Sequence, residues 1–206
     1  MSRPDTSIDP RILESARCEF LACGYEDASL KTICANANVT TGALYKRYKG
    51  KEDLFLAVVK PTLDDLYTML ETKRIKDPAA ILDQELFTAW DMKESYMLWW
   101  FTYLYERRDN FVLLLRCSQG TSLSNFAHDF VVRMSDASYE YYLEAKHRGL
   151  SNADITVTEM HILLSSFWTT VYEPFIHDFT WEEIVAHSAI VCRLFNWYQV
   201  LGFSNP

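Results

Sequence analysis

Cysteine pairs, glycine and proline are scarce in this sequence, and each shortage excludes a class of protein. No C-x-x-C pair occurs, and the cysteines are odd in number: Cys18, Cys23, Cys34, Cys117 and Cys192. Reduced thiols are therefore expected rather than a disulfide framework. Glycine and proline contribute only 6 residues each to a chain of 206, which is too few for a turn-rich all-β protein.

Long apolar runs are also missing. The longest, near residues 96–105, is too short to span a bilayer. Residues 1–11 contain no apolar core of the kind that a signal peptide needs. We therefore expect a cytoplasmic protein that makes no contact with a membrane.

What is abundant is helical periodicity, combined with 15% aromatic residues that argue against disorder. Start and stop signals such as Asp9-Pro10, Gly24, Thr180 with Glu183, and Gly149 divide the chain into helices. Beyond residue 50 the expected helices are 51–73 with a kink at Pro61, 77–91, 94–107, 110–117, 123–147, 155–172 and 181–201. The predicted fold class is all-α. The run within 94–107 is apolar nearly all round, so that helix is expected at the centre.

Acidic residues are absent from one window, residues 29–51, which holds Lys31, Lys46, Arg47, Lys49 and Lys51. The formal net charge of the whole chain is -8. Residues 1–51 carry 8 Lys and Arg against 6 Asp and Glu, whereas the remainder carries 12 against 22. An acidic protein approaches DNA only if a basic end faces it, so this window is the candidate DNA-facing end.

The window has the pattern of two short helices joined by a tight turn. Apolar residues occupy the positions that would pack the helices together, namely Leu30, Ile33, Cys34, Ala37, Val39 and Leu44. Asn38 falls between the helices, where a residue that tolerates the left-handed conformation is needed. Ser29 and Thr40 or Thr41 are the expected N-caps. The pattern predicts a helix-turn-helix.

The stretch I-C-A-N-A-N-V-T-T-G-A-L-Y-x-x-Y-x-x-K-E, residues 33–52, resembles the DNA-binding signature of the tetracycline-repressor (TetR) family. The resemblance covers roughly residues 10–55, with Asn38, Cys34 and Gly50 as mild departures from the family pattern. It implies a three-helix DNA-binding domain over residues 1–53 and a helical ligand-binding and dimerisation domain over 54–206. Members of the family are homodimers that release DNA when they bind a small ligand, so a double-stranded operator and a small-molecule effector are the expected partners.

Hydroxyl, amide and ammonium groups of the window suit contacts with DNA. Lysines neutralise phosphates, tyrosine hydroxyls donate to phosphate oxygens, and small residues let a helix approach the bases. The expected DNA-binding residues are Ser29, Lys31, Thr40, Thr41, Gly42, Ala43, Tyr45, Lys46, Tyr48 and Lys51. A solvated charged face is the plain alternative, and the ordered helix-turn-helix pattern argues against it.

Large aromatic residues of the second domain are candidates to line a ligand cavity: Trp90, Trp99, Trp100, Tyr103 and Trp168. A solid aromatic core is the alternative for each of them. Residues 155–172 and 181–201 carry more apolar residues than one core face needs, which predicts a homodimer through a four-helix bundle.

No catalytic constellation is present, so an enzyme is not expected. One Glu-x-x-His pair, Glu144 and His147, lacks the second pair that a di-iron bundle requires. A surface pair is the simpler interpretation, and neither a metal nor a cofactor is expected. The sequence therefore favours a ligand-responsive transcriptional regulator, and the resemblance implies that it is a repressor. The alternative is an all-helical small-molecule carrier or sensor that does not bind DNA.

Overall fold

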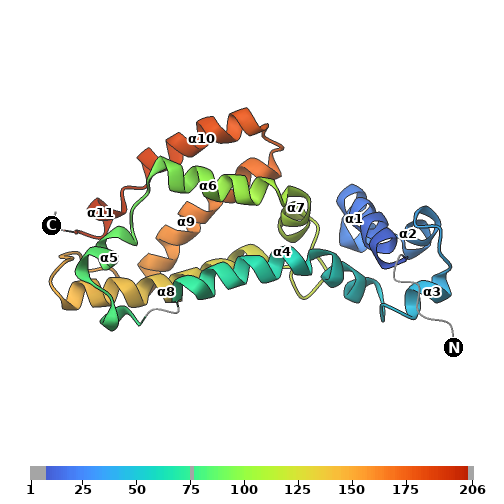
Figure 1. Ribbon diagram of the computed structural model, residues 1–206, viewed down its shortest axis with the longest axis horizontal. Coiled ribbons are helices and arrows are strands. Elements are labelled where there is room, and N and C mark those ends of the chain that lie inside the picture. Colours follow the sequence, from blue (N-terminus) through green and yellow to red (C-terminus); the bar gives the residue numbers. More distant parts are fainter. Residues whose placement is uncertain (1–7, 75–76, 204–206) are drawn as a thin grey trace. The chain divides into compact units, whose positions relative to one another are not determined.

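The structure, a computed structural model, describes residues 8–74 and 77–203. These residues form helices and one isolated bridge between Ser151 and Phe203, so the all-α prediction is confirmed (Figure 1). The helices are α1 (Ile8–Asp27), α2 (Leu30–Asn36), α3 (Thr41–Tyr45), α4 (Lys51–Arg74), a 3-10 turn η1 (Pro78–Ala80), α5 (Asp83–Thr88), α6 (Glu94–Tyr105), α7 (Arg108–Arg116), α8 (Phe126–His147), α9 (Val157–Ile176), α10 (Trp181–Leu194) and α11 (Trp197–Val200). None of the described helices is long and apolar enough to cross a membrane.

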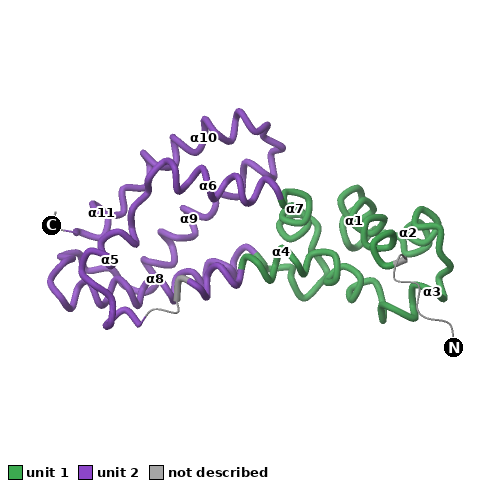
Figure 2. Tube along the Cα trace, viewed as in Figure 1, with its two compact units in different colours: residues 1–66, 107–126 green, residues 67–106, 127–206 purple. Residues whose placement is uncertain are grey.

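Packing divides the chain into two compact units (Figure 2). Unit 1 comprises residues 1–66 and 107–126, and unit 2 comprises residues 67–106 and 127–206. The helix α4 contributes its first part to unit 1 and its last part to unit 2. The expected domain boundary after residue 53 is defined by function and not by packing. It stays a prediction.

The core of unit 1 joins α1 to the helices that follow it. One face of α1, including Ile12, Ala16 and Phe20, is completely buried. The Phe20 ring meets that of Phe55 on α4 edge to face, with 5.1 Å between ring centroids. Leu44 of α3 is also fully buried. Short α2 and α3 are thus held by packing, which is what stabilises helices too short to persist alone.

Local signals at the helix-turn-helix are confirmed. The Thr32 N–H donates to Ser29 Oγ at 3.3 Å, and the Ala43 N–H donates to Thr40 Oγ1 at 3.1 Å. Asn38 has a φ of 53°, the left-handed conformation expected of the turn. Both caps satisfy N–H groups that have no partner within their own helix.

Two expected helices are interrupted. Instead of one helix over 77–91, η1 and α5 are separated by extended residues Ile81 and Leu82. The expected helix 181–201 ends at Leu194, and α11 begins only after the non-helical residues Phe195 and Asn196. In α1, Gly24 leaves the helical conformation as expected, yet the chain makes one more turn to Asp27.

Arg148 gives the physical reason for the first interruption. Its Nη1 donates to the Ile81 carbonyl at 2.8 Å, and its Nη2 donates to the carbonyls of Pro78 and Ala79, each at 3.0 Å. A helix through these residues would use the same carbonyls internally. Because a distant guanidinium binds them, the backbone can turn here without leaving these acceptors unpaired.

The helix α6 lies along α10 in unit 2 (Figure 1). Its buried face carries Met97, Phe101 and Leu104, whereas Trp99 is 50% exposed. The exposed Trp99 contradicts the expectation that this helix lies at the centre rather than on the surface. Aromatic neighbours cover part of the exposed indole, because the Trp99 ring stacks between Tyr96 and Tyr103 with centroids 6.3 and 5.8 Å away.

Candidate functional site

The expected DNA-binding residues gather on α2, α3 and the segments that flank them. Most are exposed, namely Lys31, Thr40, Thr41, Gly42, Tyr45 and Lys46. Ser29, Ala43, Tyr48 and Lys51 are half-buried. This set therefore forms a surface of hydroxyl and ammonium groups on unit 1, and its role in binding DNA stays a prediction.

The two capping hydroxyls remain available as donors. Each accepts a backbone N–H through an oxygen lone pair, as described for Ser29 and Thr40. A hydroxyl also carries one O–H donor, which is free to point toward a phosphate oxygen. Burial raises the pKa of Tyr48, and the nearby Asp9 carboxylate raises it further, so its phenol is a neutral O–H donor near pH 7.

Lys51 is held by the end of α1. Its Nζ donates to the Glu26 carbonyl at 2.7 Å and to the Ala28 carbonyl at 3.1 Å. The same nitrogen lies 4.8 Å from the centroid of the Tyr25 ring. An ammonium has three donors, so one N–H remains for a phosphate after the two carbonyls are bound.

Arg47 also belongs to this surface, although the sequence analysis predicts no role for it. Its Nε pairs with the Asp9 carboxylate, and its Nη1 donates to the Ala43 carbonyl at 3.2 Å. The pair links the end of α3 to the start of α1 across 38 residues. The sequence shows that Asp9 and Arg47 carry opposite charges, but nothing in it indicates that they meet.

Gly42 lies on the exposed side of α3 with open space around it. A Cβ built at this position would meet only Thr40 Oγ1, at an ordinary 3.9 Å. Its φ is not in the left-handed range. Neither packing within the chain nor backbone conformation therefore requires glycine here, which leaves close approach by another molecule as a reason for it.

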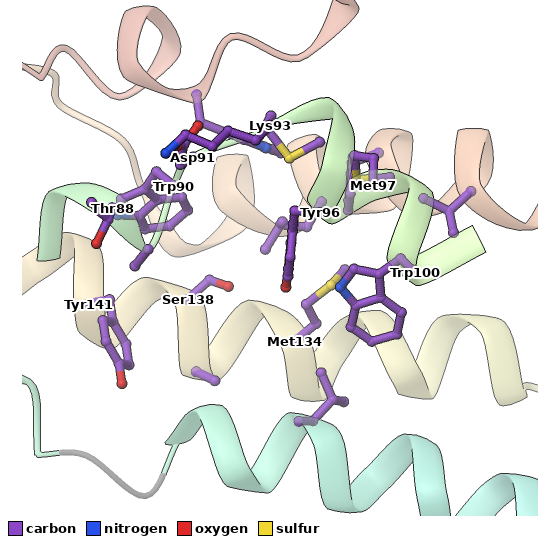
Figure 3. A pocket seen from close by; sticks show the side chains of 18 of the residues that line it. Thr88, Trp90, Asp91, Lys93, Tyr96, Met97, Trp100, Met134, Ser138 and Tyr141 are labelled. Atoms are coloured by element: carbon purple, nitrogen blue, oxygen red, sulfur yellow. The ribbon is translucent and has the colours of Figure 1, made fainter. Parts of the chain in front are cut away.

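Unit 2 contains a cavity of about 780 Å³. Its walls come from the end of α4, the η1–α6 stretch, α8, α9 and α11, and they are mainly apolar. Figure 3 shows polar side chains gathered at one end, by the connection between α5 and α6: Thr88, Trp90, Asp91 and Lys93. Toward the other end lie Met97, Trp100 and Met134. The size and apolar lining are typical of a small-molecule site.

Three of the five aromatic candidates line this cavity: Trp90, Trp100 and Trp168. Trp99 and Tyr103 are not among its lining residues. Consecutive residues on a helix point about 100° apart, so Trp100 faces the cavity while Trp99 does not. Sequence reasoning missed the methionines, whose flexible thioethers suit an adaptable wall.

A second surface of unit 2 exposes apolar side chains on the two helices expected to dimerise. On α9, Ile162 is exposed, and on α10 Val185, Ile190 and Leu194 are exposed, the last by 64%. Small residues such as Ala186 lie among them and are exposed as well. Exposed apolar groups on adjacent helices are typical of a protein interface.

Glu144 of the Glu-x-x-His pair is bound by a neighbouring arginine. Glu144 accepts from Arg148 Nε at 2.6 Å, so it belongs to the Arg148 cluster. Within residues 8–74 and 77–203, no group of three or more His, Cys, Asp or Glu side chains could hold a metal ion.

Comparison with known proteins bears on both units. Residues 12–58 match the family model described as bacterial regulatory proteins, tetR family. This match spans α1 to the first part of α4, which contains the helix-turn-helix. The predicted resemblance is therefore confirmed for the DNA-binding domain. No curated protein sequence matches the chain.

Solved structures share the fold along nearly the whole chain. A TetR-like transcriptional regulator from Rhodococcus sp. RHA1 has a TM-score of 0.63 at 14% identity, covering 98% of this chain and 100% of the other. The regulator FadR from Bacillus subtilis, in complex with stearoyl-CoA, has a TM-score of 0.60 at 17% identity, covering 90% and 96%. GusR of Salmonella enterica has a TM-score of 0.59 at 19% identity, covering 97% of each chain.

Proposed function

We propose that this chain, which carries the DNA-binding domain of the tetR family and the fold of solved regulators, is a repressor that leaves its operator when a small molecule fills the cavity of unit 2. The observation that carries the proposal is the acid-free pair α2 and α3, which displays exposed hydroxyls and lysines. This pair lies inside the segment that matches the family.

The mechanism on DNA follows from residue type. Exposed Thr41 and Lys46 lie on or beside α3, the helix expected in the major groove, where a lysine suits guanine O6 and N7 and a threonine methyl suits thymine. Lys31 and the hydroxyls of Ser29 and Thr40 suit the phosphates on either side. Contacts with phosphate supply affinity and salt dependence, whereas contacts with base edges supply sequence preference.

A gel-shift experiment with the DNA upstream of the encoding gene tests this part. We expect a shifted band that is competed by unlabelled fragment but not by unrelated DNA. A chain that binds small molecules in unit 2 and no fragment of the genome would instead be a carrier or sensor, and the proposal would be abandoned.

Dimerisation is the second component. We infer that residues 155–172 and 181–201, through exposed side chains such as Ile162, Ile190 and Leu194, pack against a second copy of the chain. Two copies would present two recognition helices to successive turns of DNA, about 34 Å apart. The exposed serine, threonine and alanine residues among the apolar ones would let the helices approach closely.

Ligand control is the third component. One helix, α4, begins at Lys51 in unit 1 and contributes Leu70 to the cavity wall in unit 2. It also contains Pro61, which removes one helical hydrogen bond and makes bending easier at that point. A ligand that fits only one placement of α4 would shift DNA affinity by no more than its differential affinity, typically about 1–3 kcal/mol. The stearoyl-CoA bound in a structure of the same fold has a long acyl chain, which supports a ligand with an apolar part.

Coupling is tested by titrating hydrophobic and aromatic compounds while tryptophan fluorescence and operator binding are followed together. The expected result is that compounds which quench the cavity tryptophans also weaken the DNA complex. A compound that binds tightly in the cavity and leaves operator affinity unchanged would contradict ligand control, although the cavity would remain a binding site.

A further inference from the structure

The helix α9 contains a proline whose missing N–H leaves one carbonyl without its helical donor. Pro174 lies inside α9 and is buried. In an α-helix the N–H of each residue donates to the carbonyl four positions earlier, and proline has no N–H. The helix itself therefore supplies no such donor to the carbonyl of Thr170. A carbonyl that is shielded from solvent needs a donor from another part of the chain or from water.

The neighbouring helix α10 supplies that donor. The Nε2 atom of His187 lies 2.7 Å from the carbonyl oxygen of Thr170, which is 17 residues away in the sequence. A carbonyl oxygen can only accept, so Nε2 carries the proton and donates it. The bond ties α10 to α9 at the turn of α9 where the hydrogen bonding of the helix is interrupted.

Aromatic residues hold the ring of His187 from other sides. Its centroid lies 5.9 Å from that of Phe101 on α6 and 6.1 Å from that of Phe179, both edge to face. Phe101 is completely buried, and Phe179 belongs to the connection between α9 and α10. A rotation of the His187 ring away from Thr170 would lose these contacts. The donor is therefore held in position by packing.

His187 lies beside the surface that is proposed to bind a second copy of the chain. One turn further along α10 is Ile190, which is 51% exposed, and Leu194 is exposed one turn beyond it. On α9 the same surface includes the exposed Ile162. A surface built from two helices keeps its shape only while the helices keep their relative position.

We propose that His187 is a positioning residue, which holds α10 on α9 through the carbonyl that Pro174 leaves without a helical donor and so preserves the surface for dimerisation. This rests on the proposed homodimer. Without the donor, α10 would shift until water reaches the Thr170 carbonyl. Dimerisation would then require α10 to return to its native position, and the apparent affinity would fall in proportion to the fraction of chains that hold it there.

Substitutions in the full-length chain test this role. His187→Phe keeps an aromatic ring and removes the N–H, whereas His187→Gln places an amide N–H the same number of bonds from the main chain. Pro174→Ala returns an N–H to position 174, so that the Thr170 carbonyl can accept from within α9. The double variant combines Pro174→Ala with His187→Phe. His147→Phe is the control, since it makes the same ring exchange at an exposed position of α8.

The readouts are the dissociation constant of the dimer, from sedimentation, and the midpoint of thermal unfolding at one fixed chain concentration. We expect His187→Phe to raise the dissociation constant about 5-fold or more, as when one chain in five holds α10 in its native position. The midpoint should fall by about 2–4 °C, the shift that one ordinary hydrogen bond produces in a chain of this length. His187→Gln should recover most of both losses, and His147→Phe should resemble the wild type.

The decisive comparison is the effect of His187→Phe in two backgrounds. With Pro174 present both losses should appear, whereas with Pro174→Ala they should be small, because the Thr170 carbonyl already has a donor. Any effect of Pro174→Ala itself cancels in this comparison. Should His187→Phe fail to fold, folding of the double variant would support the inference, and its failure to fold would overturn it.

Equal losses from His187→Phe in both backgrounds would overturn the inference, and so would a His187→Gln variant as impaired as His187→Phe. A lower midpoint with an unchanged dissociation constant would show a stabilising contact that does not position the surface, which also contradicts it. A monomeric wild-type chain would refute the homodimer. The thermal midpoints would in that case still decide whether His187 replaces the donor that Pro174 lacks.

Discussion

Lys51 Nζ lies 2.7 Å from the Glu26 carbonyl oxygen, so the first residue of α4 is bound to the end of α1. This contact joins the start of α4 to the end of α1, the two helices that precede and follow the helix-turn-helix in the sequence. Exposed lysines that suit DNA and a lysine that holds the domain together thus occur within one basic window. Substitutions in this window therefore need two readouts, stability and DNA affinity.

Replacing Lys51 by alanine should affect both readouts. Loss of the two carbonyl contacts is expected to lower the free energy of unfolding by about 1 kcal/mol, the value of an ordinary hydrogen bond for a side chain that is half exposed. Loss of one phosphate contact should reduce the slope of log affinity against log salt by about one unit. Lys60→Ala is the control, since Lys60 pairs with Asp64 at 2.8 Å on the surface. Wild-type stability in the Lys51 variant would contradict the first expectation, and a wild-type salt slope the second.

Gly42→Ala should keep or raise the stability of the chain while it lowers operator affinity. Alanine is favoured over glycine in a helix interior by about 0.5–1 kcal/mol, and the added methyl meets nothing closer than 3.9 Å. Thermal unfolding should therefore occur at the same or a higher temperature, while operator affinity falls because the methyl group keeps α3 away from DNA. Undiminished operator binding by this variant would show that no close approach takes place at Gly42.

Charge on α10 should prevent dimerisation. Leu194 is 64% exposed and Ile190 is 51% exposed, so glutamate at either position should leave the monomer fold intact and place a charge in the expected interface. Sedimentation at micromolar concentration should show a dimer for the wild type and a monomer for Leu194→Glu. Leu143→Glu, on an exposed position of α8, is the matched control and should remain dimeric. A wild-type chain that sediments as a monomer would contradict the interface.

Arg148→Met should loosen one wall of the cavity. Three backbone carbonyls of residues 78–81 would lose their donor, so the free energy of unfolding is expected to fall. Hydrogen exchange should increase in residues 77–91, and affinity for cavity ligands should fall because Ile81 and Trp90 belong to this stretch. Arg133→Met is the control: Arg133 is exposed and lies over the Tyr67 ring. Unchanged exchange in residues 77–91 would contradict the role of Arg148.

The helix-turn-helix could be predicted from the sequence because its signals are local. Ser29 and Thr40 cap helices that start at the next residue, and Asn38 itself takes the left-handed conformation that the turn needs. Each of these features depends on neighbours within four positions, which is the range that propensity and capping rules describe.

The cavity could be predicted only in part, because its walls depend on distant contacts. Arg148 determines the path of Ile81 from 67 residues away, and nothing near Ile81 in the sequence indicates this. Within α6 almost every residue is apolar, so periodicity cannot tell that Trp100 faces the cavity and Trp99 does not.

The central claim is that exposed groups on α2 and α3 bind DNA, and Lys46 tests it most directly. Lys46 is exposed and caps the C-terminal end of α3, the helix expected in the groove. The measurement is operator affinity of wild type and Lys46→Ala across a series of salt concentrations, with Lys60→Ala beside them. We predict sequence-specific binding by the wild type, a loss of affinity in Lys46→Ala equivalent to about 1–3 kcal/mol, and no change in Lys60→Ala. The account would be contradicted if each of the three proteins bound operator and unrelated DNA with equal affinity, or if none of them bound DNA.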